Sequence, residues 1–137
     1  MNRTDFQEIA EIRLQESKAL LAAGFAEGAY YLAGYAVECA LKACTARRTR
    51  EHDFPDKKLV NDSHTHNLKA LLHLAELEVE LDTVIAADTA MESALDTILD
   101  WSETTRYQKK TPQEATALVK AIEDHAGGLL PWIRRHW

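Results

Sequence analysis

The run from Ala29 to Ala43 reads AYYLAGYAVECALKA and is apolar on nearly every side when it is wound into a helix. A helix of this kind belongs at the centre of a bundle, where neighbouring helices cover it on several sides. One side differs, because Tyr35, Glu38 and Lys42 are spaced by three and four residues and therefore share a face. We expect a central helix that carries a structural Glu–Lys pair on this face.

The composition is that of one soluble globular domain. The chain has 137 residues, of which 46% are hydrophobic and 28% charged, and its formal net charge is -6. No apolar run approaches the roughly 18 residues of a membrane span, and no signal peptide precedes the first amphipathic pattern. Cys39 and Cys44 lie too close together on one helix to form a disulfide. We expect a cytoplasmic protein with a single domain over residues 1–137 and no membrane contact.

Helix start and stop signals divide the chain into an all-α pattern. Thr4 and Gln7 match a capping box, and Gly24 is a natural residue to follow a helix end, so a first helix is predicted between them. A second helix then covers about 26–50, and the segment 53–64 is predicted to be a polar loop.

Shorter helices are predicted in the second half of the chain. They are a helix from Thr65 or His66 with Leu68, Leu71, Leu72 and Ala75 inward, a helix over Asp88–Trp101, a helix from the capping box of Thr111 and Glu114 to Gly127, and a short helix over Leu129–His136. No strand-like alternation of useful length occurs. The expected fold is an all-α, up-and-down helical bundle of two long antiparallel helices plus three or four shorter helices.

Several landmarks of the sequence resemble those of a known family. They are the run from Tyr30 to Ala43, then His66-Asn67-Leu68 ahead of a Leu-rich helix, then Trp101 to Tyr107, and finally Trp132-Ile133 with Trp137. Their combination in this order is similar to the HEPN domain family of prokaryotes. The resemblance covers almost the whole chain.

The resemblance implies a compact helical bundle that often forms a two-fold homodimer through its long helices. Proteins of this family are frequently encoded beside a small nucleotidyltransferase, as toxin–antitoxin or similar pairs. Many are metal-independent endoribonucleases that carry an Arg-x(4–6)-His motif, with the active site assembled across the dimer. Others lack the motif and are binding or structural partners.

One pair of residues satisfies the spacing of that motif. Arg47 and His52 have four residues between them at the exit of the second helix, although Arg48 follows where the family has a polar residue such as Asn or Asp. As a catalytic pair, His52 would take the proton of the attacking 2′-OH, and Arg47 would stabilise charge on the phosphate oxygens. The alternative is that Arg47, Arg48 and Arg50 are cations near a helix C-terminus, where they favour the macrodipole.

Three further residues are expected to bind the substrate, namely Arg50, His66 and Arg106. His52 and His66 flank the same loop, so they are expected to line one pocket. The structural alternatives are that His66 caps the third helix or lies in its first turn, and that Arg106 forms a salt bridge to Glu38 or another carboxylate of the bundle, because a buried carboxylate needs a partner.

Other chemistries receive less support from the residues. His52, Asp53, His64 and His66 offer zinc ligands, but no second Cys/His pair fixes a geometry, so no metal is expected. No glycine-rich phosphate loop is present, so no cofactor is expected. The segment Trp132–Trp137 mixes aromatics with arginines as a base-stacking surface does, but a terminal helix that docks on the core explains the same pattern.

Taken with the resemblance, these residues predict a HEPN-domain protein that acts on or binds RNA or nucleotides. It would be either a metal-independent endoribonuclease toxin of a toxin–antitoxin-like module or, as the alternative, a non-catalytic helical interaction module that partners a nucleotidyltransferase. A homodimer is expected in both cases.

Overall fold

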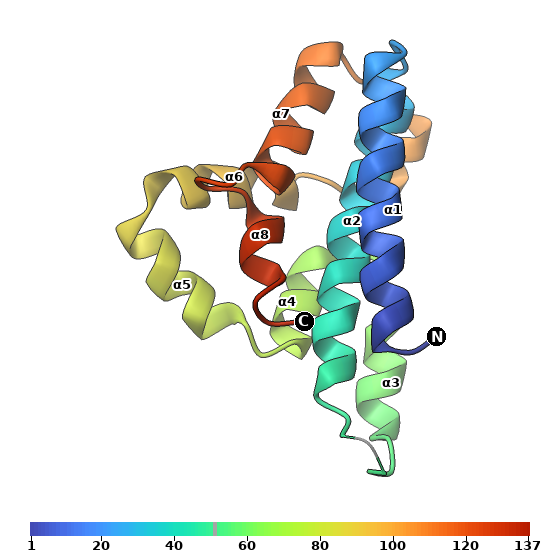
Figure 1. The fold of residues 1–137 in the computed structure, drawn as a ribbon, viewed down its shortest axis with the longest axis vertical. Helices are drawn as coiled ribbons and strands as arrows, with labels where there is room; N and C mark the ends of the chain where they lie inside the picture. Colours follow the sequence, from blue (N-terminus) through green and yellow to red (C-terminus); the bar gives the residue numbers. More distant parts are fainter. Residues whose placement is uncertain (51) are drawn as a thin grey trace.

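The computed structural model describes residues 1–50 and 52–137, and every regular element among them is a helix. The two longest are α1 (Arg3–Ala22) and α2 (Ala26–Arg47). They pack side by side in opposite directions, α1 rising from the N-terminus and α2 descending beside it (Figure 1). The predicted all-α bundle on two long antiparallel helices is therefore confirmed.

Six shorter α-helices and one 3-10 helix complete the described part of the chain. They are α3 (Lys57–Ser63), α4 (Leu68–Leu74), α5 (Glu78–Ala87), α6 (Thr89–Leu99), η1 (Glu103–Tyr107), α7 (Pro112–Glu123) and α8 (Leu129–Ile133). This exceeds the three or four expected, because α3 lies in the predicted polar loop and α5 where the periodicity predicts no element. These two helices bury few residues, none in α3 and only Leu81 in α5, so they leave no apolar stripe in the sequence.

α2 is the central helix, as its apolar composition predicts. The helices α1, α4, α7 and α8 pack on it together with η1. Gly34 allows one of these close approaches, since a Cβ atom at this position would lie 2.0 Å from the indole of Trp101. Trp101 is buried and donates from Nε1 to the backbone carbonyl of Tyr31 at 3.2 Å. The segment that leads into η1 is thereby fixed against the first half of α2.

The ends of α1 are set by two local signals. The capping box is formed by Asn2 and Asp5, so the prediction of Thr4 with Gln7 is wrong by two residues. Both pairs have the same spacing, and the sequence alone does not separate them. At the other end Gly24 follows the cap residue with a φ of +87°, as predicted for a helix stop.

The later boundaries follow the predictions in part. Thr111 and Glu114 form the predicted capping box at the start of α7. α7 ends at Glu123, before the predicted Gly127, and α2 ends before the predicted Arg50. Among the residues that the structure describes, every helix is too short or too polar to cross a lipid bilayer.

Candidate functional site

One face of α2 carries polar side chains in an otherwise apolar helix. Tyr31, Tyr35, Glu38, Lys42 and Thr45 recur every three or four residues, and we call them the polar stripe. At the rise of an α-helix the polar stripe is about 21 Å long. Tyr31, Tyr35 and Lys42 are partly exposed, whereas Glu38 and Thr45 are buried. The stripe therefore combines side chains that solvent can reach with side chains that are buried.

Glu38 is the buried charge at the middle of the polar stripe. Its side chain is 4% exposed; Oε1 accepts a hydrogen bond from Lys42 Nζ at 2.7 Å, and Oε2 lies 2.9 Å from His66 Nδ1. The predicted Glu–Lys pair is thus confirmed. The second partner is His66, so the alternative of a salt bridge from Arg106 to Glu38 is wrong. Two polar partners compensate for the cost of burying the carboxylate.

The upper end of the polar stripe is an aromatic and cationic cluster. Tyr31 and Tyr35 pack edge to face with ring centroids 5.0 Å apart, and their hydroxyl oxygens are 3.3 Å apart. His66 packs against Tyr35 with centroids 5.7 Å apart. The Arg106 guanidinium lies 4.9 Å from the centre of the Tyr107 ring and close to the Tyr31 hydroxyl. The structure therefore brings two predicted site residues, His66 and Arg106, to the same pair of tyrosines.

The surroundings of this cluster shift two pKa values. Burial raises the pKa of Tyr35 above its ordinary value, and the hydrogen bond with Tyr31 raises it further. The nearby Tyr31 hydroxyl also raises the pKa of Arg106. Tyr35 keeps its proton and Arg106 its charge at neutral pH, so the cluster presents a phenol and a guanidinium as hydrogen-bond donors.

The lower end of the polar stripe opens into a groove of about 1180 Å³ between α1, α2 and α3, which we call the α3 groove. α3 lies beside the start of α1 at the bottom of the bundle (Figure 1). The cationic side chains that line the groove are Arg3, Lys42 and Arg47, and none of the described residues that line it is acidic. Because Lys42 also binds Glu38, the groove adjoins the Glu38–His66 pair.

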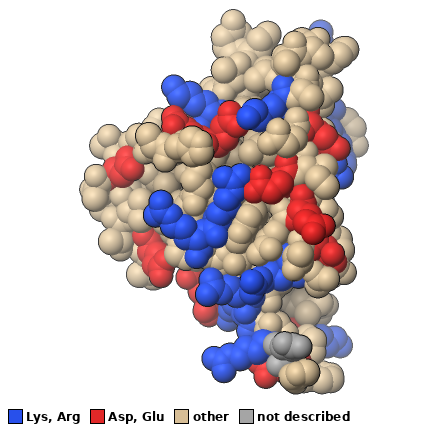
Figure 2. Space-filling view, viewed as in Figure 1, with Lys and Arg blue, Asp and Glu red and all other residues tan. Residues whose placement is uncertain are grey.

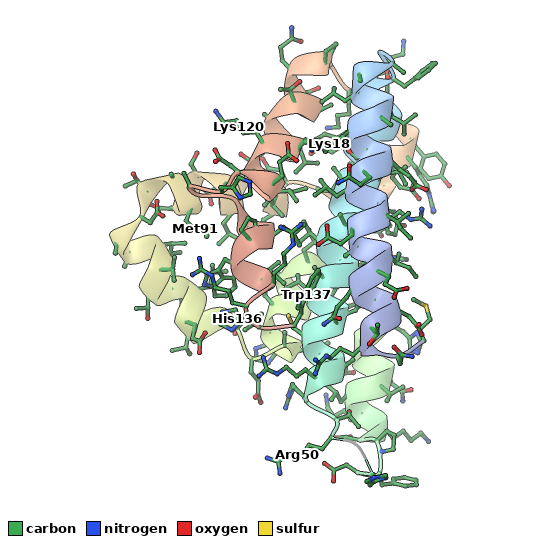
Figure 3. All side chains as sticks on the ribbon, viewed as in Figure 1. Lys18, Arg50, Met91, Lys120, His136 and Trp137 are labelled. Carbon is green, nitrogen blue, oxygen red and sulfur yellow. The ribbon has the colours of Figure 1, made fainter. Side chains whose placement is uncertain are left out.

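A second hollow, of about 680 Å³ between α1 and α7, has a different charge balance. We call it the α7 hollow. Its cations Lys18 and Lys120, which lie in the upper part of Figure 3, are accompanied by Glu123 and Asp124 in the lining. Lys18 forms an ion pair with Glu123 at 2.7 Å. The α3 groove differs in two of its three cations: Lys42 pairs with Glu38, but Arg3 and Arg47 form no ion pair with a described residue.

The predicted catalytic pair, Arg47 and His52, lies at the exit of α2. Arg47 is exposed and donates from Nη1 to the backbone carbonyl of His136 at 2.9 Å. His52 is exposed in the following loop and has a φ of +75°. Arg50 projects from the lower end of the molecule (Figure 3). The arginines of this segment thus face solvent and the C-terminal residues.

The expected pocket shared by His52 and His66 is not found in the described residues. His66 binds Glu38 at the middle of α2, and the histidine that lines the α3 groove is His64. His66 also does not cap α4, because the capping residue there is Asn67. Within the described part of the chain, no group of three or more His, Cys, Asp or Glu side chains is arranged to hold a metal ion.

Arg48 has partners in another element of the bundle. Its guanidinium donates to the carbonyl of Leu74 at 2.7 Å and pairs with Glu76 at 2.7 Å, which ties α2 to the end of α4. Arg47 and Arg50 form no ion pair with any described residue. Figure 2 shows Lys and Arg side chains gathered from the middle of this face to its lower end.

The tryptophans pack on the core and do not form a stacking surface. Trp132 is buried and contacts His136, and Trp137 packs against the core cluster, as predicted for a docking terminal helix. The exposed aromatics that accompany cations are tyrosines. All four tyrosines of the chain lie around the first half of α2 and η1: Tyr30, Tyr31, Tyr35 and Tyr107. The signal in the sequence is the pair Arg106-Tyr107, whose proximity to α2 depends on the tertiary fold.

Comparison with known proteins identifies no relative of this chain: no family model, no curated protein and no solved structure matches it. The HEPN resemblance therefore stays a prediction.

Proposed function

We propose that this chain is a HEPN-like protein that binds single-stranded RNA along the polar stripe and the α3 groove. The observation that supports it is the charge of the groove, which has three cationic side chains and no acidic residue among the described residues of its lining, in a chain of net charge -6. A hollow lined by one sign of charge concentrates ligands of the opposite sign. A polyanion such as RNA is the ligand class that this groove attracts.

The two ends of the polar stripe suit the two parts of a nucleotide chain. Arg3 and Arg47 in the α3 groove are suited to backbone phosphates, because one guanidinium group can donate two parallel hydrogen bonds to a phosphate. At the other end, Tyr31 and Tyr107 beside Arg106 combine aromatic faces with a cation. Proteins that bind single strands use this combination, because every base can stack on an aromatic ring.

Metal-independent cleavage of the bound RNA, in a toxin–antitoxin-like module, is the catalytic form of this proposal. Two histidines are available as the base. His52 has the motif spacing from Arg47, whereas His66 has a fixed position beside the polar stripe. A cytoplasmic homodimer with a nucleotidyltransferase as its partner belongs to the same proposal.

RNA binding is tested by fluorescence anisotropy with a labelled single-stranded RNA over a series of salt concentrations. The double variant Arg3→Gln/Arg47→Gln removes two charges from the α3 groove. Its affinity should fall by about tenfold or more, and the salt slope by about 1.4 if both residues contact phosphates, at about 0.7 per contact.

The matched control is Lys18→Gln/Lys120→Gln, which removes two charges from the α7 hollow. This variant has the same net charge as the groove variant, so it should bind RNA like the unchanged chain if location matters. Equal losses in both variants would mean that only net charge acts. No binding by the unchanged chain would contradict the proposal.

A second candidate, the non-catalytic interaction module, is supported by two exposed apolar side chains, one in the lining of the α3 groove and one next in the chain to Pro55, which lines it. Phe54 is 97% exposed, and Val60 lines the groove and is 42% exposed. Exposed apolar side chains of this size favour contact with another protein. Light scattering of the unchanged chain and of Phe54→Ser tests this candidate: loss of a dimer in the variant supports it, and a monomer in both contradicts a homodimer through this surface.

A further inference from the structure

We infer that His66, oriented by the buried Glu38, is the general base of an RNA-cleaving site on the polar stripe, with Lys42 and Arg106 as the cations beside it. This inference rests on the proposed function, because it needs RNA as the ligand. The reacting side chain would then lie beside the middle of α2, where His66 contacts Glu38, and away from Arg47 and His52, which have the motif spacing.

The geometry of His66 is that of a poised base. A carboxylate only accepts hydrogen bonds, so the ring nitrogen 2.9 Å from Glu38 Oε2, Nδ1, carries the hydrogen. In the neutral ring, Nε2 then has a free lone pair. The His66 side chain is 49% exposed although Glu38 is 4% exposed, so the edge of the ring away from Glu38 faces solvent. The Tyr35 ring packs against the imidazole and restricts its rotation.

Glu38 is itself held on its other oxygen. Lys42 binds Oε1 at 2.7 Å, and its side chain is 16% exposed at the border of the α3 groove. The carboxylate therefore has one cation and one imidazole, and each occupies its own oxygen. Such a second layer of contacts is what fixes the tautomer and direction of a catalytic histidine. Glu38 is a positioning residue here, since it reaches the substrate only through His66.

Cations on both sides of His66 can hold the phosphate. Lys42 lies on the groove side, and Arg106 lies on the other side, beside Tyr31. A phosphodiester between these groups would have its non-bridging oxygens near positive charge, which stabilises the additional negative charge of the transition state. By contrast, Arg47 uses a guanidinium nitrogen to bind the His136 carbonyl.

The proposed step needs no metal or other co-reactant. His66 Nε2 takes the proton of the ribose 2′-OH, the 2′ oxygen forms a bond to phosphorus, and the bond from phosphorus to the 5′ oxygen breaks. The leaving 5′ oxygen takes a proton from water, and the hydroxide formed is neutralised by the proton on His66. The products are a 2′,3′-cyclic phosphate and a 5′-hydroxyl end.

The experiment compares RNA cleavage in EDTA by the unchanged chain and by His66→Gln, His52→Gln and His125→Gln, each checked for folding and for RNA binding by anisotropy. The inference predicts that His66→Gln loses about 100-fold or more in rate, the usual contribution of a general base. His125→Gln, in the lining of the α7 hollow, is the control and should cleave at nearly the unchanged rate. The loss in His52→Gln should be far smaller than the loss in His66→Gln.

The position of the hydrogen on His66 can be measured in the unchanged chain, where folding is not at risk. Long-range proton–nitrogen NMR of labelled histidines should show His66 with hydrogen on Nδ1. Addition of a dinucleotide with 2′-O-methyl groups, which cannot react, should shift the His66 signals and leave those of His125 unchanged. In Glu38→Gln the tautomer preference should be lost, and in Glu38→Asp it should be restored in part with activity.

The failures are distinguishable. Absence of RNA binding overturns the proposed function and the inference together. RNA binding without cleavage, or cleavage that survives His66→Gln but not His52→Gln, overturns the inference alone. An Nε2–H tautomer in the unchanged chain also overturns it, because Nε2 would have no lone pair for the 2′-OH proton.

Discussion

The middle of α2 and its exit each place a histidine near cations, but the two regions hold them differently. In the middle, His66 binds a carboxylate that is 4% exposed, and an aromatic ring covers one side of the imidazole. At the exit, His52 and Arg50 are exposed in or next to a loop. The motif spacing selects the exit, whereas burial and hydrogen bonding orient His66 in the middle. Sequence spacing therefore identifies candidates, and the tertiary structure shows how His66 is oriented.

The largest effect is expected where the packing of the middle region is broken. Gly34→Ala would place a methyl group 2.0 Å from the buried Trp101 indole, so the free energy of unfolding should fall by about 3 kcal/mol, the upper part of the range for overpacking. Chemical denaturation measures this change. The control is Gly28→Ala on the same helix, where the nearest atom is the flexible end of Leu20 and stability should be kept or improved. Equal losses would contradict the close packing of η1 on α2.

The next effect comes from removing the charge in the middle. Glu38→Ala leaves Lys42 and His66 without their shared partner. A fully buried pair would cost 3–5 kcal/mol, but these side chains are 16% and 49% exposed and can reach water, so we expect about 2 kcal/mol. The melting temperature and the denaturation midpoint report the loss. An unchanged stability would mean that Glu38 does not hold the Lys42 and His66 side chains.

A matching change at the exit should cost less. Arg47→Ala removes one hydrogen bond from an exposed guanidinium to the His136 carbonyl, which water can replace. The free energy of unfolding should fall by less than about 1 kcal/mol, as for other exposed charged contacts. RNA binding should still weaken, because Arg47 lines the α3 groove. Large destabilisation would assign Arg47 to the core architecture and remove the contrast between the two regions.

The smallest effect concerns the two thiols, one in each region. Burial raises the pKa of Cys39 to about 11 and that of Cys44 to about 12, from 9.0. Above pH 9 the unfolded chain loses the thiol protons, whereas the folded chain keeps them. The contribution of the thiols to the free energy of unfolding is therefore complete below pH 9 and declines as the pH rises towards 11. A thiol reagent at neutral pH should react with neither residue in the folded protein. Fast reaction of Cys44 alone would show that the exit opens while the middle stays closed.

Short-range patterns of the sequence predict the fold well. Three predicted features involve residues no more than four positions apart, and all three are present. They are the apolar repeat of α2, the Glu38–Lys42 pair and the capping box of α7. Such features depend on helix geometry alone, because residues three or four positions apart share a face of a helix. The close approach at Gly34 is different, because its partner Trp101 is brought there by the tertiary structure.

The candidate site is less predictable, because its contacts join distant segments. His66 reaches Glu38 across 28 residues, and the neighbours of Tyr31 include Arg106 from η1. The α3 groove depends on α3, a short exposed helix with no buried residue, which hydrophobic periodicity cannot detect. His66 and Arg106 can be nominated from the sequence, but their common position beside the tyrosines cannot.

The measurement that tests the central claim most directly is photo-crosslinking of a 4-thiouridine RNA to the folded chain, followed by mass spectrometry of the peptides. The account predicts crosslinks to the polar stripe, the α3 groove and their neighbours, within 1–6, 31–49, 55–66 and 106–107. Crosslinks confined to the α7 hollow around Lys18 and Lys120, or to the C-terminal residues alone, would contradict it. So would the absence of crosslinks at RNA concentrations well above any measured dissociation constant.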